Sequence, residues 1–180
     1  MANTITVKGV GRATVSPDLV ILSMNLESKD LVYAKAMETA SENQERLTKA
    51  LTKAGFHKKS IKTSNFNVNT DYEYVHHPDG RGESVFAGYV VNQGLKVEFD
   101  FDSKRLLKAL TAIGECDAHP QLSIQFTVKD RASVNEALLR SATDNARRKA
   151  EVLCEASGKK LGELLSINYN WAELELVSNS

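Results

Sequence analysis

The sequence has no excess of charge of either sign, no long apolar run and only two cysteines. Its 180 residues carry 23 basic and 23 acidic side chains, so no global field favours nucleic acid or an anionic membrane. No apolar stretch approaches the roughly 18 to 20 residues that span a bilayer. We therefore expect no membrane span and no nucleic-acid partner, and a chain of this length forms one domain or two small lobes that share a core.

The two cysteines give little support to redox chemistry. Cys116 and Cys154 each lie in a helix-like stretch among apolar neighbours, and free cysteine packs as a small hydrophobe. We expect two reduced, mostly buried thiols, with a disulfide between them as the alternative. A redox-active thiolate is disfavoured because it needs an accessible, electropositive setting, and the neighbours of Cys154 imply burial.

A secretory signal is also missing. The first residues lack a basic segment followed by about 7 to 15 apolar residues, as the printed sequence shows. For the chain as given we therefore expect a cytoplasmic location. A periplasmic or cell-surface location is the alternative if a signal has been trimmed from the chain.

Metal-binding residues are few and poorly spaced. The histidines are His57, His76, His77 and His119, whereas a metal site needs three or four ligands that converge. The adjacent His76 and His77 point to opposite sides of an extended segment, and only Asp79 adds a nearby ligand. We expect a solvated hairpin tip there and no metal site.

Cofactor and nucleophile motifs are absent as well. Gly9 and Gly11 interrupt the first predicted strand and are not followed by the strand-to-helix turn of a phosphate-binding loop. We interpret them as glycines that relax an edge strand. No G-x-S-x-G nucleophile elbow occurs in the sequence, so we expect no catalytic residues and no cofactor.

Hydrophobic periodicity predicts alternating strands and helices along the chain. Apolar residues at every second position indicate strands, and steps of three and four indicate helices. The predicted elements, in order, are strands at 5–15 and 20–26, a helix at about 30–54, strands at 61–74 and 85–101, a helix at about 103–114, a strand at 122–128, a helix at about 133–157 and a strand at 165–171.

Local signals refine these boundaries. Gly55 is expected to end the first helix, and the change of apolar parity near Ser64-Asn65 predicts a β-bulge. Residues 76–82 read as a turn-rich tip. Ser133 and Glu136 have the spacing of a capping box that would start the third helix, as the printed sequence shows.

These elements predict an α+β fold with the order ββαββαβαβ. Residues of about 18–130 alone give βαββαβ, the ferredoxin-like pattern with helices on one face of an antiparallel sheet. One strand precedes this portion, and a long helix and a strand follow it. We expect these three elements to add to the same two layers, one of sheet and one of helices. We expect a single domain over residues 1–180. The alternative is two interleaved lobes, one of about residues 18–130 and one of residues 1–17 with 131–180.

Several sequence pieces resemble the SIMPL-domain family, which has long been known as a domain of unknown function. The similarity covers nearly the whole chain, and the order and spacing of the pieces make it specific. The matching pieces are ITVKGVGRATVSPD, AMETASENQERLTKALTKAG, the strand with IKT and the tyrosines after it, GYVVNQGLKVEF, LSIQFTV and EALLRSATDNARRKAEVLCEASGKKLGELLSI.

The resemblance implies properties that the residues alone do not. Members are small α+β proteins of bacteria, and many are exported to the periplasm or the cell surface, although the usual export signal is missing here. Several are linked to oxidative-stress tolerance, and homo-oligomeric assembly is expected. The family has no established catalytic residues, so none are carried over to this chain.

The two long strands predicted at 61–74 and 85–101 form the candidate functional feature. They exceed the usual 5 or 6 residues, so their hairpin is expected to project beyond the core, and long exposed edges invite pairing with another chain. The alternative is that their apolar residues cover the protein's own helices. The predicted self-association surface consists of Tyr72, Tyr74, Val85, Phe86 and Tyr89.

We therefore expect a non-enzymatic, self-associating binding or scaffolding protein. An enzyme or redox protein with an unrecognised pocket is the first alternative. A nucleic-acid-binding module is the second, because ferredoxin-like sheets of other families bind RNA by stacking bases on aromatic residues. The sequence carries no RNP-like string, and the basic residues at 58–62 and 147–149 read as helix-end and solvated charges.

Overall fold

The computed structural model describes residues 4–77 and 81–169. It divides the chain into two compact units, residues 17–127 and residues 1–16 with 128–180. Each unit is described by itself. The tip predicted at 76–82 includes residues 78–80, and the last predicted strand includes Trp171; both lie outside the described residues.

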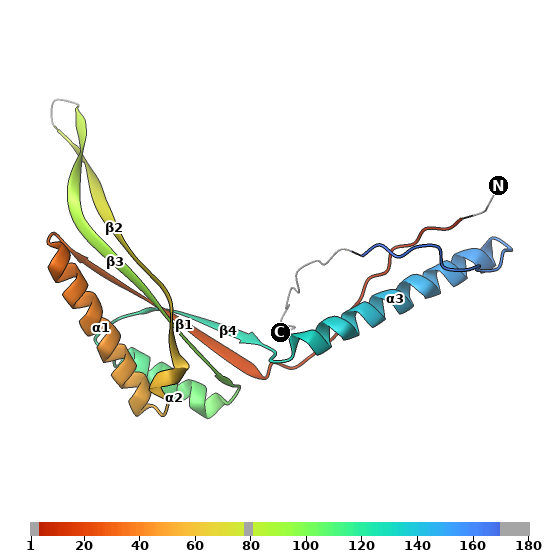
Figure 1. Ribbon diagram of the computed structural model, residues 1–180, viewed down its shortest axis with the longest axis horizontal. Coiled ribbons are helices and arrows are strands. Elements are labelled where there is room, and N and C mark those ends of the chain that lie inside the picture. Colours follow the sequence, from red (N-terminus) through yellow and green to blue (C-terminus); the bar gives the residue numbers. More distant parts are fainter. Residues whose placement is uncertain (1–3, 78–80, 170–180) are drawn as a thin grey trace. The chain divides into compact units, whose positions relative to one another are not determined.

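The unit of residues 17–127 is an antiparallel sheet with helices on one face (Figure 1). The strand order is β2-β3-β1-β4. This chain order and strand order confirm the predicted α+β class and its ferredoxin-like portion. The elements are β1 (Leu19–Asp30), α1 (Tyr33–Lys53), the short 3₁₀ helix η1 (Lys58–Ser60), β2 (Ile61–His76), β3 (Gly82–Asp100), α2 (Ser103–Gly114) and β4 (Gln121–Thr127).

The core of this unit lies between the sheet and its two helices. Every second residue of β1 is buried, because alternate side chains of a strand point to the same face. Leu47 and Leu51 of α1 and Ala109 of α2 close the layer from the other side. The opposite face of the sheet carries polar residues such as Ser23. The buried β1 residues are Val20, Leu22, Met24 and Leu26.

The helix boundaries follow local capping chemistry. Helix α1 begins three residues later than predicted because Asp30 is still in β1 and its Oδ1 accepts a hydrogen bond from the Val32 amide at 2.7 Å. Gly55 follows the helix with φ of 99°, which confirms it as the terminating residue. Helix α2 has the predicted bounds, and Asp102 caps it by accepting from the Lys104 amide at 2.8 Å.

The hairpin of β2 and β3 contains two bulges. The pairing shifts between Thr63 and Asn65, which confirms the bulge predicted at Ser64-Asn65. A second shift, between Asp71 and Tyr72, leaves Ala87 unpaired opposite them. The sequence pattern did not indicate this second bulge.

The second unit is built on α3 (Arg131–Ala156). The predicted capping box is wrong, because Asp130 is the N-cap residue and accepts from the Ser133 amide at 2.9 Å. Glu136 pairs with Arg140 one turn later on the helix. The aspartate offers a charged acceptor at the helix start, which is stronger there than the serine hydroxyl.

The first and last predicted strands are wrong for the described residues. Residues 4–18 and 159–169 are assigned to no strand. The reason is that residues 8–12 lie along α3. Side chains of α3 form hydrogen bonds with the backbone amides and a carbonyl of this segment. Asn145 Oδ1 accepts from the Val10 amide at 3.0 Å, and Lys149 Nζ donates to the Lys8 carbonyl at 2.9 Å.

Gly9 and Gly11 are therefore contact positions, and their interpretation as glycines of an edge strand is wrong. A Cβ on Gly9 would overlap the carbonyl oxygen of Ala142, and one on Gly11 would overlap that of Leu138. Glycine is required here because the segment lies directly on the helix backbone.

Candidate functional site

The hairpin of β2 and β3 continues beyond the end of its neighbour β1. Strand β1 pairs with β3 only as far as Asp30 opposite Tyr89. From there residues 71–76 and 82–88 pair only with each other within the described sheet. We call these residues the hairpin arm (Figure 1). The arm is therefore a two-stranded ribbon, which is marginally stable in water when nothing covers it.

The second bulge decides which side chains of the arm share a face. Gly88, with φ of 130°, lies where a Cβ would come 2.8 Å from the Asp30 carbonyl oxygen. Because Ala87 is unpaired, Phe86 and Tyr89 fall on the same face of β3, although three positions separate them. The bulge thus gathers aromatic residues that regular alternation would separate.

A chain of edge-to-face aromatic contacts follows from this arrangement. The ring centroids of Tyr72 and Phe86 are 5.7 Å apart, and those of Phe86 and Tyr89 are 5.2 Å apart. Tyr89 continues to Tyr33, at the start of α1, over 5.4 Å. Tyr89 is thus half-buried by residues of its own unit. For Tyr89 this agrees with the alternative that the apolar residues of the hairpin cover the protein's own helices.

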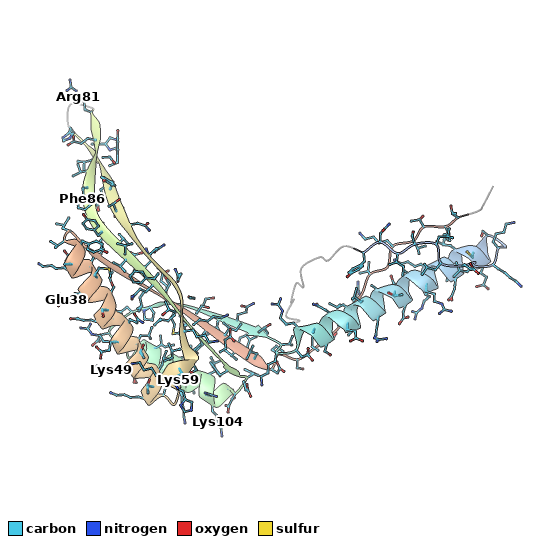
Figure 2. All side chains as sticks on the ribbon, viewed as in Figure 1. Glu38, Lys49, Lys59, Arg81, Phe86 and Lys104 are labelled. Atoms are coloured by element: carbon cyan, nitrogen blue, oxygen red, sulfur yellow. The ribbon has the colours of Figure 1, made fainter. Side chains whose placement is uncertain are left out.

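The outer aromatic residues remain open to solvent. Tyr72 and Tyr74 are 56% and 63% exposed. Phe86, the partner of Tyr72 in the sheet, lies below Arg81 on the arm in Figure 2. Such neighbouring exposed rings are typical of contact surfaces rather than of isolated surface residues.

Val85 lies on the other face of the arm. It pairs with Glu73, and both alternate with the positions of Tyr72 and Tyr74. The structure therefore brings Tyr72, Phe86 and Tyr89 together and places Val85, also exposed, behind them. Regular alternation would place Tyr89 on the face of Val85, four positions earlier, and the bulge moves it to the face of Phe86.

Tyr74 also supports the arm itself. Its ring lies over Gly82, where a Cβ would overlap the phenol oxygen, and it contacts His76 with centroids 4.9 Å apart. An aromatic ring over a strand glycine shields an otherwise bare stretch of backbone. Tyr74 therefore combines a structural contact with a large exposed area.

An ion cluster fixes the base of the arm. Lys29 Nζ lies 2.7 Å from Asp71 Oδ2 and 3.4 Å from Glu73 Oε1, and it joins β1 to β2 across β3. The hydrogen bond from Lys29 holds the pKa of Asp71 below its ordinary value of 3.8. The same hydrogen bond with Asp71 raises the pKa of Lys29.

Three exposed apolar residues near the arm were missed from the sequence. Leu31, Val32 and Tyr33 connect β1 to α1 and are all exposed. Leu31 and Val32 follow the last strand residue directly, whereas helical spacing places Leu31 in the apolar stripe of the predicted helix. Their exposure extends the apolar surface from the arm, through the Tyr33–Tyr89 contact, to the start of α1.

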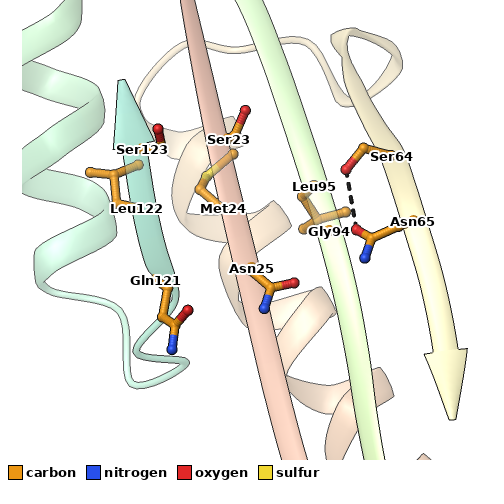
Figure 3. Close-up of a pocket in the computed structure, with 10 residues that line it drawn as sticks. All are labelled: Ser23, Met24, Asn25, Ser64, Asn65, Gly94, Leu95, Gln121, Leu122 and Ser123. Carbon is orange, nitrogen blue, oxygen red and sulfur yellow. Dashed lines mark hydrogen bonds between the residues drawn. The ribbon is translucent and has the colours of Figure 1, made fainter. Parts of the chain in front are cut away.

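The open face of the sheet has a shallow polar hollow (Figure 3). Its volume is about 330 Å³. Neither a thiol nor a charged side chain lines it, so this hollow supplies no general acid, base or thiolate nucleophile. The lining residues are Ser23, Met24, Asn25, Ser64, Asn65, Gly94, Leu95, Gln121, Leu122 and Ser123.

Metal-ligating residues do not gather in the described part of the chain. No group of three or more histidine, cysteine, aspartate or glutamate residues lies together among residues 4–77 and 81–169. His77 Nε2 contacts Glu83 Oε1 at 3.3 Å across the arm. These two residues form a pair and fall short of a metal-ligand set.

Both cysteines are free thiols, as predicted. Cys116 is buried, which confirms its expected environment. Cys154 is half-exposed, and the expectation of burial is wrong because its neighbours Val152 and Leu153 face solvent. Helix α3 carries more apolar side chains than the other described residues bury.

Within the described residues, no helix is long and apolar enough to cross a membrane.

Comparison with known proteins gives one family and several distant relatives. A sequence model of the SIMPL family, described as a protein of unknown function (DUF541), matches residues 5–177. The 26 kDa periplasmic immunogenic protein of Brucella melitensis is 28% identical over 172 residues, which cover 91% of this chain and 65% of that protein. The uncharacterized protein YggE of Escherichia coli K12 is 24% identical over 168 residues, which cover 92% of this chain and 65% of that protein.

The chain thus spans 65% of the length of these curated relatives. Among solved structures, the ATP complex of B. subtilis GlnK is similar with a TM-score of 0.32 and 10% identity, over 59% of this chain and 84% of that one. A TM-score at this level carries no argument about fold or function.

Proposed function

Because the chain belongs to the SIMPL family of proteins of unknown function, we propose that it is a non-enzymatic, self-associating binding or scaffolding protein. The proposed contact surface is the face of the hairpin arm that bears Tyr72, Tyr74 and Phe86, with Tyr89 at its base. The observation that carries the proposal is that the arm extends past β1 and presents exposed rings on one face. Val85, on the other face, is proposed as a secondary contact.

The proposed partner is the arm of a second copy. Two copies can place their aromatic faces together about a two-fold axis, so that each ring covers the same residues on the other chain. Fully burying one large apolar side chain contributes about 1.5–3 kcal/mol. Covering the arm would also stabilise a ribbon that is otherwise marginal.

The enzymatic alternative has less support. The polar hollow of Figure 3 offers no acid, base or thiolate. Cys154 is accessible, but the residues around it on α3 include both Arg147 and Glu151, which pair with each other at 2.9 Å. The positive charge of Arg147 is thus already paired, so the binding or scaffolding role is the one we propose.

Sedimentation velocity of a point variant tests the proposal. We expect Tyr72→Ser to weaken self-association by about tenfold or more, since each 1.4 kcal/mol is a factor of ten. Leu107→Ser is the matched control, because Leu107 is 66% exposed on α2 and outside the arm. Equal weakening by both variants, or by neither, would contradict the proposal.

We also propose a periplasmic location for this protein. The two Brucella relatives are named as periplasmic proteins, which supports this location and gives no support to the expected cytoplasmic location. A stress-related role of the assembly follows from the family resemblance alone. Fractionation of cells that express the natural gene tests the location, and finding the protein in the cytoplasmic fraction would contradict it.

A further inference from the structure

The segment after α3 is apolar and uncovered. Gly158, with φ of 69°, ends the helix, and the chain turns back over residues 159–169 (Figure 1). Leu165 and Ile167 are 79% and 64% exposed, and Leu164 is exposed to a similar degree. This pattern of exposed apolar residues indicates a contact surface, and the described residues of the same unit leave it exposed.

In the same unit, the N-terminal segment lies against α3, whereas residues 159–169 are all exposed. Residues 8–12 lie on α3, and the Arg12 amide donates to Ser141 Oγ at 3.1 Å. Val10 and Lys8 bond to Asn145 and Lys149, which follow Ser141 at steps of four residues. Two residues of extended chain advance about as far as four residues of helix, so this stripe of α3 is matched to one segment and is used by it.

The edge strand β4 is a complementary surface. It has β1 as its one neighbour in the described sheet. Its seven residues, Gln121–Thr127, include neither a charged residue nor a proline, the usual protections of an exposed edge. Leu122, Ile124 and Phe126 alternate along it and are each more than one-third exposed.

The two segments have the same alternation. In residues 165–168, Leu165 and Ile167 alternate with Ser166 and Asn168. In β4, the exposed apolar residues alternate with Ser123 and Gln125. Paired strands share their faces, so one register places apolar beside apolar on the helix-bearing face and polar beside polar on the open face.

We propose that residues 161–169 of one copy add as a strand to the β4 edge of a second copy, and that the exchange is reciprocal. Strand addition gives both segments a row of backbone hydrogen bonds, and alternate side chains give it specificity. A second copy is the inferred partner because this chain contains both halves of the contact, and reciprocal exchange closes as a symmetric dimer. The proposal shares self-association with the proposed function but uses a surface separate from the hairpin arm.

Hydrogen exchange read by mass spectrometry tests this strand addition. In the wild-type protein, the amides of residues 161–169 should exchange slowly at protein concentrations above the association midpoint and rapidly below it. Ile167→Lys should abolish this slow exchange, because the ammonium would have to enter the apolar face. Ser166→Lys is the matched control, since the same charge falls on the polar face, and it should preserve the slow exchange.

A second pair of variants tests the receiving edge. Ile124→Lys should release residues 161–169 to fast exchange, whereas Ser123→Lys should not. If Ile124→Lys fails to fold, Ile167→Lys still decides, because Ile167 is mostly exposed and its replacement leaves the chain's own core intact.

Three results would overturn the strand addition. Fast exchange of residues 161–169 at all concentrations would show that nothing covers them. Slow exchange at all concentrations would place the partner within the same chain. Equal effects of Ile167→Lys and Ser166→Lys would exclude the proposed register. Tyr72→Ser should weaken the arm contact and preserve slow exchange at concentrations where strand-exchanged dimers persist, so failure of the two proposals can be told apart.

Discussion

At the scale of single residues, Gly9 and Gly11 hold the N-terminal segment on α3. Neither position leaves room for a Cβ against the helix backbone. We predict that Gly9→Ala destabilises this contact by about 1–3 kcal/mol, the usual cost of overpacking. Gly162→Ala is the control, because no atom lies within 4 Å of a Cβ there. Urea unfolding and amide exchange of residues 5–13 measure the effect, and equal stability of the two variants would refute it.

The ion pair of Lys29 and Asp71 makes the stability of the base of the arm depend on pH. The lowered pKa of Asp71 contributes stability above its unfolded pKa, and this contribution is lost as the pH falls through the folded value. The raised pKa of Lys29 contributes stability below its unfolded value of about 10.5, and this is lost as the pH rises through the folded value. The pair should therefore support the arm over the neutral range.

We predict that Lys29→Ala returns the pKa of Asp71 toward its ordinary value of 3.8. The physical reason is loss of the charged hydrogen-bond donor at 2.7 Å. An NMR titration of the Asp71 carboxyl group measures this change, with Lys53→Ala at the far end of α1 as the control. An unchanged titration of Asp71 in Lys29→Ala would rule out the cluster as the cause.

At the scale of elements, the sequence indicated β1 to β4, α1 and α2 to within a few residues. Their signals are local, because the apolar alternation of β1 and the glycine after α1 depend only on nearby residues. The second bulge was missed because Ala87 departs from the ladder only where Gly88 meets Asp30, a residue far away in the sequence. Gly9 was misinterpreted for the same reason, since its contact with Ala142 is not local.

Mutation at the start of α3 distinguishes Asp130, the N-cap residue in the structure, from Ser133, the N-cap residue that the sequence suggested. We predict that Asp130→Ala destabilises the helix by about 0.5–2 kcal/mol, the usual cost of removing an N-cap side chain. Ser133→Ala should have little effect, because Ser133 contributes its backbone amide to the cap and no side-chain acceptor. Thermal unfolding followed by circular dichroism compares them. A larger loss for Ser133→Ala would restore the capping box that the sequence suggested.

At the scale of the whole molecule, the projecting hairpin was predictable but the layout of its surface was not. Strand length alone indicated that β2 and β3 outrun the core, and it led to the five surface residues. The position of Tyr89 on the aromatic face, and not on the face of Val85, depends on the bulge, and the exposure of Leu31 and Val32 depends on where β1 ends. Chemistry was not predictable from motifs, because the sequence contains none that define a reaction.

Two self-complementary surfaces on one chain predict a stepwise assembly. Contacts between two arms and strand exchange at β4 each relate copies by a two-fold axis, and two such contacts together build assemblies larger than a dimer. Removing one contact should leave the smaller assembly held by the other. Removing both should leave the monomer.

Light scattering of a variant without the arm tests the central claim most directly. Replacing residues 72–87 by Asn-Gly joins Asp71 to Gly88, which are paired in the sheet, through a favoured two-residue turn. We predict a folded protein with fewer copies per assembly than the wild type, which becomes monomeric when Ile167→Lys is added. A folded variant with an unchanged number of copies per assembly would contradict self-association through the hairpin arm.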